Sequence, residues 1–597
     1  MAEEEDAGGG RLIGETDVLA AITSEYLDEY AGKKDTAAAT VCLGRVLMTT
    51  FRFQFVPDEH EYDRVRRHLL GRGEDEIASF FLVPLGCIAS VRKKNSVIEI
   101  CTKDLRQLSF RFDVVEITKV LWSERGGLLP ENVLAEEPLL PCVLDWDVYD
   151  DQAEWDRQGV FDNGKWRVTT CNENFRIIET YPERLVVPFT VPDEVLLDAM
   201  NFRSLGRIPC LCWLNSSNGA TLCRSSQPKV GMSKATSPAD ESLVSGIASS
   251  SLLRDELHII DCRPMTNALT GMLLAADPVV YHSGRAVIDH NDAFWFDSSM
   301  KKLRNLCASP SCDNLRWLGS IEDTKWLVYI RQLLKTGLHV ASLLRAGESV
   351  LLHCSHGWDR TSQIVALAQL FVDPYFRTWK GFQVLIEKEW LSFGHPFQLR
   401  HSHGEKADTQ ESPIFIQFLD CVSQLVRIYP SYFEYVGSAH LFNEGLLLLL
   451  ADALHSCRFG TFLFDCKKHR HEANLENRTA SVWTWVNGFR PQLTEQFFVP
   501  TQSLNPPPSG LLKRVMLWDA MFMRWAGQPL VQEPATVTDF FPDNSQRTPT
   551  WQMPQGTVNT LNAALTIKYR EAQLIQELKE RIATLDLKVK SRRGSRH

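Results

Sequence analysis

Short runs of alternating apolar and polar residues fill the chain from about residue 38 to 118. They read VCLGRVLMTTFRFQFV, FFLVPLGCIASVRKK and VIEICTKDLRQLSFRF, and turn residues separate them. A period of two places every second side chain on the same face of a sheet. The pattern predicts a small antiparallel β domain over residues 38–128, preceded by an acidic leader at residues 1–37 that we expect to be largely flexible.

A different pattern begins at Trp146, where longer apolar stretches alternate with short strands such as RLVVPF and SVLLHC. This alternation is typical of an α/β domain, with a central sheet and flanking helices. We place that domain at residues 146–530, after a linker at residues 129–145. Within it, the serine-rich segment Ser225–Ser251 is expected to be a surface excursion.

Residues 555–590 predict a C-terminal helix. Its apolar residues are spaced alternately by three and four positions: Ile575, Leu578, Ile582, Leu585 and Val589. Such a seam is typical of a coiled coil, although this one spans only about two heptads. Two interpretations stay open, a coiled coil that forms a homodimer or heterodimer and a helix that caps the body. The basic residues at its end could attract an anionic bilayer weakly, or form a solvated tail.

Length and composition exclude several classes of protein. With 597 residues, 44% hydrophobic and 23% charged, the chain is typical of a globular protein of two or three domains. The net charge of −10 argues against a nucleic-acid partner. The fifteen cysteines are scattered, as in a reduced cytoplasmic protein. The acidic N-terminus does not resemble a signal peptide, and Leu446–Leu450 is too short to span a bilayer, so membrane contact is expected to be peripheral.

The stretch SVLLHCSHGWDRTSQIVALAQLFVD carries the candidate chemistry. An apolar strand precedes Cys354, a helix with one buried face is predicted over 361–371, and five residues separate Cys354 from Arg360. A tight loop before a helix directs N–H groups and the helix dipole at one point, where a phosphate can bind and a thiol becomes a thiolate. Arg360 can hold two phosphate oxygens and Gly357 permits the turn, while Thr361 could stabilise the sulfur as it leaves.

The spacing alone is weak evidence for a phosphate site, because a Cys and an Arg six positions apart should occur by chance roughly once in such a chain. The strand before the loop and the helix after it make the signal specific. An inert buried thiol for Cys354 and a surface ion pair for Arg360 are the alternative interpretations.

The motif HCSHGWDRT resembles the signature of the myotubularin family. Segments on both sides are similar to that family as well: WDVYDDQAEWDRQGV, TYPERLVVP, FRSLGRIPCLCW, RSSQPKVG, DCRPMTNA, DPYFRTWKGFQVLIEKEWLSFGHPFQLR, FLDCVSQLVRIYP and FGTFL. The β-rich segment resembles the PH-GRAM domain that precedes the catalytic domain in this family. The resemblance covers residues from about 40 to 526.

The resemblance implies a phosphatase that removes the 3-phosphate from phosphatidylinositol 3-phosphate and phosphatidylinositol 3,5-bisphosphate. It implies that Cys354 is the nucleophile, that Arg360 binds phosphate and that Asp359 is the general acid. An alternative role for Asp359 is to orient Arg360. The remaining residues implied to contact substrate are Ser355, His356, Gly357, Trp358, Thr361, Arg400 and, more distantly, Asn267 and Asn291.

Three positions depart from the family pattern. His356 stands where an Asp is usual, Pro396 replaces a common Lys or Arg, and Gly271 replaces a second Asn. The loss of charge at Pro396 weakens the case for a 5-phosphate pocket. Two rival functions stay open: a weakly active or inactive lipid-binding scaffold, and a protein-tyrosine or dual-specificity phosphatase.

The chemistry needs no cofactor. We do not expect a metal site at His353, His356, His401 and His403, because they lack Cys or carboxylate partners at ligand spacing. The expected partners are phosphoinositides at a membrane surface, and the expected location is the cytoplasm with recruitment to endosomal-type membranes.

Overall fold

A computed structural model describes much of the chain. The described residues are 17–28, 39–49, 52–69, 74–94, 97–112, 146–230, 235–251, 257–263, 293–307, 314–403, 410–436, 439–440, 442–488 and 504–525. The predicted linker, Asn267, Gly271, Asn291 and the predicted C-terminal helix lie outside them.

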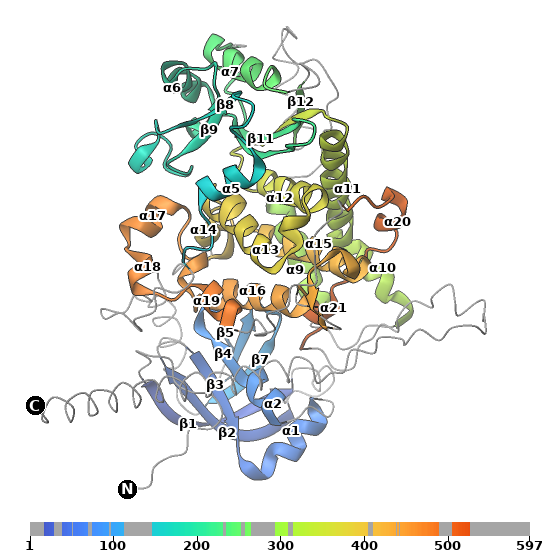
Figure 1. Ribbon diagram of the computed structural model, residues 1–597. Coiled ribbons are helices and arrows are strands. Elements are labelled where there is room, and N and C mark those ends of the chain that lie inside the picture. The colour runs from blue at the N-terminus through green and yellow to red at the C-terminus, as the bar shows by residue number, and fades with distance from the viewer. Residues whose placement is uncertain are drawn as a thin grey trace, which may run out of the picture.

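Seven antiparallel strands form an N-terminal sheet in the order β4-β3-β2-β1-β7-β6-β5 (Figure 1). Their bounds are β1 (Asp17–Asp28), β2 (Ala39–Thr49), β3 (Arg52–Pro57), β4 (Leu82–Pro84), β5 (Ile88–Lys94), β6 (Val97–Thr102) and β7 (Gln107–Phe112), with helices α1 (Tyr62–His68) and α2 (Glu74–Phe81). In β3 and β6 alternate residues are buried, as the period of two predicts. The predicted antiparallel β region is therefore confirmed, and we call it the sheet domain.

The prediction of a flexible leader is wrong for Asp17–Asp28. This segment is strand β1, which lies between β2 and β7 and pairs with both. Tyr26 is buried and its ring contacts the edge of Phe81 in the core of the sheet. Acidic residues near the start of the chain obscured a strand that supplies apolar side chains to this core.

The larger part of the molecule, residues 146–525, has a sheet in the order β10-β11-β13-β12. These strands are β10 (Cys210–Leu214), β11 (Thr221–Ser226), β12 (Leu257–Asp261) and β13 (Ser349–Cys354). β11 and β12 both run parallel to β13, and β10 is antiparallel to β11. The predicted strands at RLVVPF and SVLLHC are present as β9 and β13. The region is mixed α/β and rich in helices, as predicted.

Helices cover both faces of this sheet (Figure 1). Val350 and Leu352 of β13 face the core that contains α11 and α12, whereas Leu351 packs with Val244 and Ile247 of α7. The other elements are α5 (Asp151–Gln158), β8 (Trp166–Thr169), β9 (Leu185–Pro188), α6 (Asp193–Phe202), α7 (Pro238–Ala248), α9 (Ala293–Cys307), α10 (Asn314–Thr324), α11 (Trp326–Arg345), α12 (Arg360–Val372), α13 (Trp379–Ile386), α14 (Phe397–His401), α15 (Ile414–Ile428), β14 (Tyr435–Val436), β15 (Ala439–His440), α16 (Glu444–Ser456), α17 (Lys467–Glu472), α18 (Leu475–Arg478), α19 (Val482–Gly488), α20 (Pro508–Leu512) and α21 (Asp519–Phe522).

The expectation that Ser225–Ser251 is a surface excursion is wrong. Its first residues end β11, and α7 buries Leu243, Val244 and Ile247. The serine-rich composition suggested a surface loop, but serine also occurs at helix ends. Ser237, for example, caps α7, because its Oγ accepts the Asp240 N–H at 3.2 Å.

The helix predicted over 361–371 is α12, but it is buried on every side rather than on one face. It lies between the sheet and other helices, among them α11 and α15, so its polar residues are inside as well. Gln363, for example, donates to the Ile414 carbonyl oxygen at 2.9 Å.

The two parts of the molecule share an apolar contact. Cys457, Leu463 and Leu475 pack into the core of the sheet domain. Beside it, the buried Lys103 Nζ donates to the Ser402 carbonyl oxygen at 3.4 Å. Among the described helices, none combines the length and the apolar character needed to cross a membrane.

Candidate active site

The loop from Ser355 to Asp359 joins the end of β13 to the start of α12. Cys354, the last residue of β13, is 2% exposed, and Arg360, the first residue of α12, is 6% exposed. Asp359 precedes the helix but its side chain does not cap it. The first N–H groups of a 13-residue helix therefore point toward the loop without a side-chain acceptor from Asp359.

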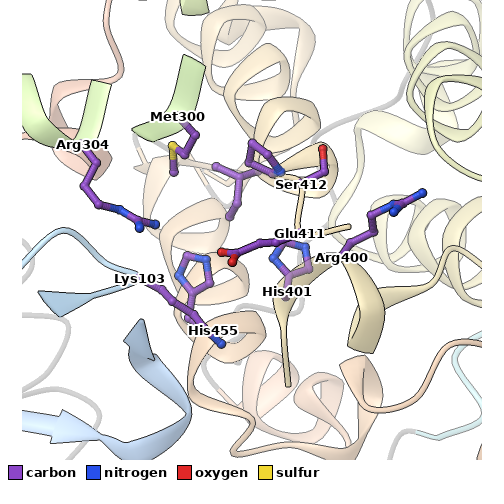
Figure 2. Close-up of a pocket in the computed structure, with 10 residues that line it drawn as sticks. Lys103, Met300, Arg304, Arg400, His401, Glu411, Ser412 and His455 are labelled. Carbon is purple, nitrogen blue, oxygen red and sulfur yellow. The ribbon is translucent and has the colours of Figure 1, made fainter. Parts of the chain in front are cut away.

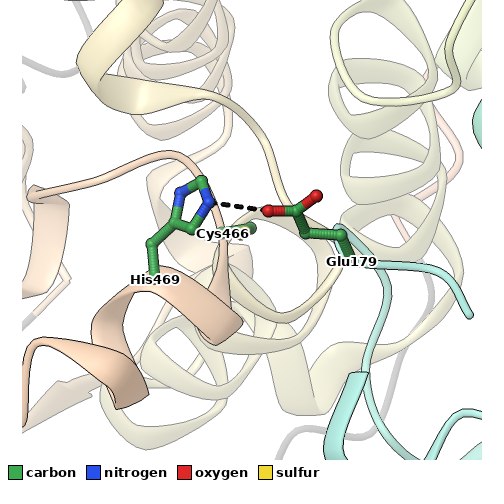
Figure 3. A group of neighbouring side chains, drawn as sticks. All are labelled: Glu179, Cys466 and His469. Atoms are coloured by element: carbon green, nitrogen blue, oxygen red, sulfur yellow. Dashed lines mark hydrogen bonds and ion pairs between the residues drawn. The ribbon is translucent and has the colours of Figure 1, made fainter. Parts of the chain in front are cut away.

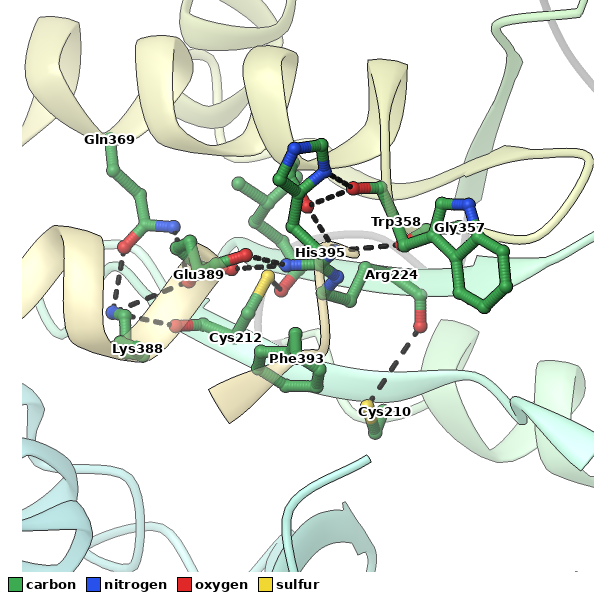
Figure 4. A network of polar contacts seen from close by, with 12 residues as sticks. Cys210, Cys212, Arg224, Gly357, Trp358, Gln369, Lys388, Glu389, Phe393 and His395 are labelled. Atoms are coloured by element: carbon green, nitrogen blue, oxygen red, sulfur yellow. Dashed lines mark hydrogen bonds and ion pairs between the residues drawn. The ribbon is translucent and has the colours of Figure 1, made fainter. Parts of the chain in front are cut away.

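Carbonyl oxygens of the loop are bonded to groups outside it (Figure 4). The Gly357 oxygen accepts from Arg224 Nη2 at 2.7 Å and Arg207 Nη2 at 3.1 Å. The Trp358 oxygen contacts His395 Nδ1 at 2.8 Å. Because these carbonyls point outward, the peptide N–H groups of the loop can point inward, which is the arrangement that binds a phosphate.

Gly357 allows this loop to pass close to the neighbouring strand. Its φ is +76°, and a Cβ placed there would lie 2.3 Å from the Ser225 carbonyl oxygen of β11. Its N–H donates to Cys354 Sγ at 3.3 Å. The loop thus needs glycine for both the left-handed backbone and the close approach.

The surroundings of Cys354 favour the thiolate. Burial raises the pKa of the thiol, but the positive charge of Arg360 and the polar groups of Thr361 outweigh it, so the pKa lies below the ordinary value. Arg360 Nη1 donates to the Cys262 carbonyl oxygen at 3.2 Å, which holds the guanidinium beside the sulfur. A nucleophile and an anion-binding fork therefore meet at one point.

Asp359 pairs with Arg400, not with Arg360. Arg400 donates from Nε to Oδ1 at 3.1 Å and from Nη2 to Oδ2 at 2.7 Å, and His395 Nδ1 lies 3.3 Å from Oδ1. Burial raises the pKa of Asp359, but Arg400 and His395 hold it well below its usual range. Asp359 is accordingly ionised in the unliganded protein, and the suggestion that it orients Arg360 is wrong for this structure.

The other residues predicted around the loop lie at its rim or beneath it. His356 and Trp358 are half-buried and their ring centroids lie 4.8 Å apart. Burial lowers the pKa of His356, so its ring is neutral near pH 7. Ser355 is half-buried with its carbonyl oxygen bonded to the Gln227 N–H, and Thr361 is fully buried at the start of α12. The loop and Arg400 thus come together, and Asn267 and Asn291 lie outside the described residues.

Sequence reasoning missed the groups that hold the loop from behind. Arg207, Arg224 and His395 belong to segments that resemble the family, but no local pattern assigns them a role. Arg224 is 0% exposed and also pairs with Glu389 at 2.8 Å. The available signal was an arginine between apolar and small residues in TLCRSS, since a charge that becomes buried requires partners.

Comparison with known proteins decides the family. A profile described as the myotubularin-like phosphatase domain matches residues 135–471, which include the whole Cys354–Arg360 loop. The chain belongs to the myotubularin family. The resemblance predicted from the motifs is therefore confirmed.

Individual myotubularin relatives match most of the chain. Myotubularin of Xenopus tropicalis is 36% identical over 521 residues, 83% of this chain and 82% of that protein. The protein named phosphatidylinositol-3,5-bisphosphate 3-phosphatase MTMR2 is 39% identical in Pongo abelii, over 75% of this chain and 70% of the relative. Its Mus musculus counterpart is 37% identical over the same shares.

One group of possible metal ligands occurs among the described residues of this myotubularin-family chain, and none of its members belongs to the loop (Figure 3). The ligand atoms of Glu179, Cys466 and His469 lie within 4.8 Å of one another. The Glu179 carboxylate already contacts His469 Nε2 at 2.8 Å and Lys468 Nζ at 3.7 Å. Burial raises the pKa of the Cys466 thiol. A neutralised carboxylate and a protonated thiol make a poor cation site.

A small cavity of about 20 Å³ lies behind Arg400, where the sheet domain meets the larger domain (Figure 2). It has room for about one water molecule. Its lining residues are Lys103, Met300, Arg304, Arg400, His401, Glu411, Ser412, Pro413, Ile416 and His455. The Arg400 guanidinium points away from the cavity, toward the active-site loop, so the cavity is not part of the phosphate site.

Proposed function

We propose that this protein is a phosphoinositide 3-phosphatase that hydrolyses phosphatidylinositol 3-phosphate through a phosphocysteine on Cys354. The observation that carries the proposal is the placement of Cys354 between β13 and α12, with the Gly357 N–H 3.3 Å from its sulfur. A thiolate at that point faces the N–H groups of the loop and the Arg360 guanidinium. Phosphoryl transfer needs this combination of nucleophile and positive field.

In the first step the Cys354 thiolate attacks phosphorus, so a sulfur–phosphorus bond forms as the bond to the inositol 3-oxygen breaks. Arg360 and the loop N–H groups bind the phosphate oxygens, whose charge shifts during transfer. In the second step water attacks phosphorus, the sulfur–phosphorus bond breaks and inorganic phosphate leaves. Thr361 stabilises the departing sulfur, because Thr361 already lowers the pKa of Cys354 and its buried hydroxyl has no other hydrogen-bond partner among the described residues.

Asp359 must be protonated to serve as the acid for the departing inositol oxygen, although its pair with Arg400 keeps it ionised in the unliganded protein. An arriving phosphate dianion offers Arg400 a stronger acceptor and places negative charge beside Asp359. Both effects raise the pKa of Asp359. We therefore expect Arg400 to turn from Asp359 to the phosphate, which leaves Asp359 able to take up and deliver a proton.

The monophosphate is the expected preferred substrate. Some relatives are named for phosphatidylinositol 3,5-bisphosphate, whose 5-phosphate calls for an additional cation. Here Pro396 precedes α14 and carries no charge, and the neighbouring Arg400, which pairs with Asp359, is expected to turn to the 3-phosphate. We also propose that the enzyme acts on lipid at membranes of the endosomal type. Dimerisation through residues 555–590 stays a prediction.

Phosphate release from the full-length protein tests the proposal. The substrates are short-chain phosphatidylinositol 3-phosphate, the 3,5-bisphosphate and a phosphotyrosine peptide, with Cys354→Ser as the inactive variant. Cys223→Ser is the matched control, because Cys223 is also fully buried but lies on the neighbouring strand β11.

We expect turnover of the lipids by the wild type and by Cys223→Ser and none by Cys354→Ser, with the monophosphate faster. A well-folded protein that turns over no substrate would indicate a lipid-binding scaffold. Preference for the peptide would indicate a protein phosphatase.

A further inference from the structure

A second cysteine lies beside Cys354 in the sheet. Strand β12 runs parallel to β13, and Asp261 is opposite His353, so Cys262 follows next to Cys354. The Cys262 N–H donates to the His353 carbonyl oxygen at 2.8 Å, which continues the pairing past the end of β12. The Cys262 carbonyl oxygen accepts from Arg360 at 3.2 Å. The segment is thus fixed to the active site on both sides of Cys262.

The two side chains point to the same face of the sheet. Val350, Leu352 and Cys354 alternate into the core that contains α11 and α12, and so do Ile260 and Cys262. Leu351 and Leu257 point into the core on the opposite face. Residues in register on neighbouring strands have Cα atoms about 4.8 Å apart, which lies within the range that a disulfide spans.

No other cysteine of the described strands has this position. On the opposite side of β13 the partner of Cys354 is Ser226 of β11. Cys223, also on β11, is opposite Leu351 and packs in the core on the other face of the sheet. The register therefore selects Cys262 as the cysteine within reach of Cys354.

The environments of the two thiols differ in a way that suits a reactive cysteine and a resolving one. The pKa of Cys354 is lowered, as described above, so Cys354 is the more nucleophilic sulfur. Burial, and then the negative charge of Cys354, raises the pKa of Cys262 well above its ordinary value. Cys262 is inert while Cys354 is a thiolate, and that repulsion is lost once Cys354 is oxidised to the neutral sulfenic acid.

We propose that Cys262 and Cys354 form an oxidative modification site, in which a disulfide between them follows reaction of Cys354 with hydrogen peroxide. The Cys354 thiolate attacks peroxide, so a sulfur–oxygen bond forms, the oxygen–oxygen bond breaks and hydroxide leaves as water after taking up a proton. The Cys262 sulfur then attacks the sulfenic sulfur, the sulfur–oxygen bond breaks, and the Cys262 proton leaves with that oxygen as a second water. Two thiols and one peroxide thereby give one disulfide and two waters.

The disulfide protects the nucleophile. A sulfenic acid without a neighbouring thiol is oxidised further to sulfinic acid, which thiols do not reduce, whereas a disulfide is reversed by thiol exchange. The active site would be switched off by peroxide and restored by a reductant. This regulation rests on the proposed function of Cys354, but the disulfide itself is detectable without any turnover.

The test treats the full-length protein with hydrogen peroxide, blocks remaining thiols and maps peptides by mass spectrometry with and without dithiothreitol. We expect a peptide that joins Cys262 to Cys354 in the wild type and in the control Cys223→Ala. Cys262→Ala should instead accumulate sulfinic acid at Cys354. After dithiothreitol, the share of its own untreated activity that Cys262→Ala recovers should be at least about fivefold lower than for the wild type.

The proposal is overturned if oxidised wild type contains sulfinic acid at Cys354 and no joined peptide. Equal recovery of the wild type and Cys262→Ala would overturn it as well. A joined peptide in a protein that turns over no phosphoinositide would support the disulfide and contradict the proposed function, so the two failures are distinguishable.

Discussion

Arg400 binds Asp359 through two nearly parallel hydrogen bonds, with Nε 3.1 Å from Oδ1 and Nη2 2.7 Å from Oδ2. Both side chains are buried, and Asp359 lies next to Arg360, to which the family resemblance assigns phosphate binding. The pair holds the Arg400 guanidinium next to the phosphate site and keeps the acid ionised until substrate arrives. Its strength thus sets the pH range over which the acid is protonated.

Replacement of Arg400 by Gln should move the pH profile of kcat/KM to higher pH. Asp359 must be protonated to act, so activity falls as pH rises through its pKa; loss of Arg400 raises that pKa, and the basic limb shifts upward. The acidic limb should shift upward too, because Arg400 and Cys354 attract each other electrostatically. The measurement is phosphate release from soluble phosphatidylinositol 3-phosphate between pH 5 and 9.

The loss of a charge-assisted contact to phosphate should also raise KM by about 10- to 100-fold. Arg400→Lys is the comparison variant, since it keeps the positive charge but cannot make both hydrogen bonds to the carboxylate. The acidic and basic limbs of its pH profile should shift less than those of Arg400→Gln. An unchanged basic limb in Arg400→Gln would show that Asp359 is not the acid.

Gly357→Ala should abolish most activity without unfolding the protein. The new Cβ would lie 2.3 Å from the Ser225 carbonyl oxygen, in a backbone conformation of positive φ, so the loop must move. A displacement of about 1 Å at a reacting group can cost about 100-fold in rate. The control is Gly164→Ala, which has φ +63° but no atom within 4 Å of the new Cβ. Full activity in Gly357→Ala would contradict the tight passage of the loop along β11.

Arg224→Lys should lower kcat/KM by about 10- to 100-fold, because the loop loses a positioning contact. The Arg224 fork bonds the Gly357 carbonyl oxygen at 2.7 Å and Glu389 at 2.8 Å from different nitrogens. An ammonium cannot reach both with the same geometry. The effect should fall mainly on kcat, because Arg224 lies behind the loop and does not line the phosphate site.

A suitable control is Arg331→Lys, which alters a half-exposed pair with Glu322 on the surface. Circular dichroism and thermal unfolding distinguish a displaced loop from a destabilised domain. If Arg224→Lys had the kinetics of the wild type, the loop would not depend on this contact.

Local sequence patterns predict the part of the site whose residues are consecutive in the chain. They do not predict the residues that reach the site from distant segments. The loop from Cys354 to Arg360 was predictable because its strand, turn and helix are consecutive in the chain. Arg207 and Arg224 were not, since they contact Gly357 across 150 and 133 positions. The pairing of Asp359 with Arg400 spans 41 positions, whereas the alternative interpretation of Asp359 paired it with Arg360. The packing of β11, α14 and the segment before β10 around the loop brings these residues together.

Some elements of the fold were misjudged for a related reason. Asp17–Asp28 becomes a strand only because β2 and β7 bond both of its edges. A serine-rich composition at Ser225–Ser251 masked helix α7, where the apolar residues that matter are few but fully buried. Composition describes the average of a segment, whereas packing depends on the few side chains that reach the core.

The folded state should lose stability as pH falls below about 6.5, because three histidines are buried at the contact between the two domains. His401, His403 and His455 are buried there, near Lys103. Burial, followed by the charges of neighbouring groups, lowers the pKa of His401 and His403 well below the ordinary value and that of His455 to about 3. Unfolded histidines bind protons below about pH 6.5 while these folded ones do not, so the unfolded state is favoured by up to about 1.4 kcal/mol per pH unit for each histidine.

Urea unfolding followed by tryptophan fluorescence at several pH values between 7.5 and 5.5 measures this slope. His403→Gln removes one titrating group, so its free energy of unfolding should fall less steeply with decreasing pH than that of the wild type, by up to about 1.4 kcal/mol per pH unit. His471→Gln, at an exposed position on α17, should leave the slope unchanged. Parallel slopes for the wild type and His403→Gln would mean that His403 binds protons equally in the folded and unfolded states, and that the contact between the domains tolerates its charge.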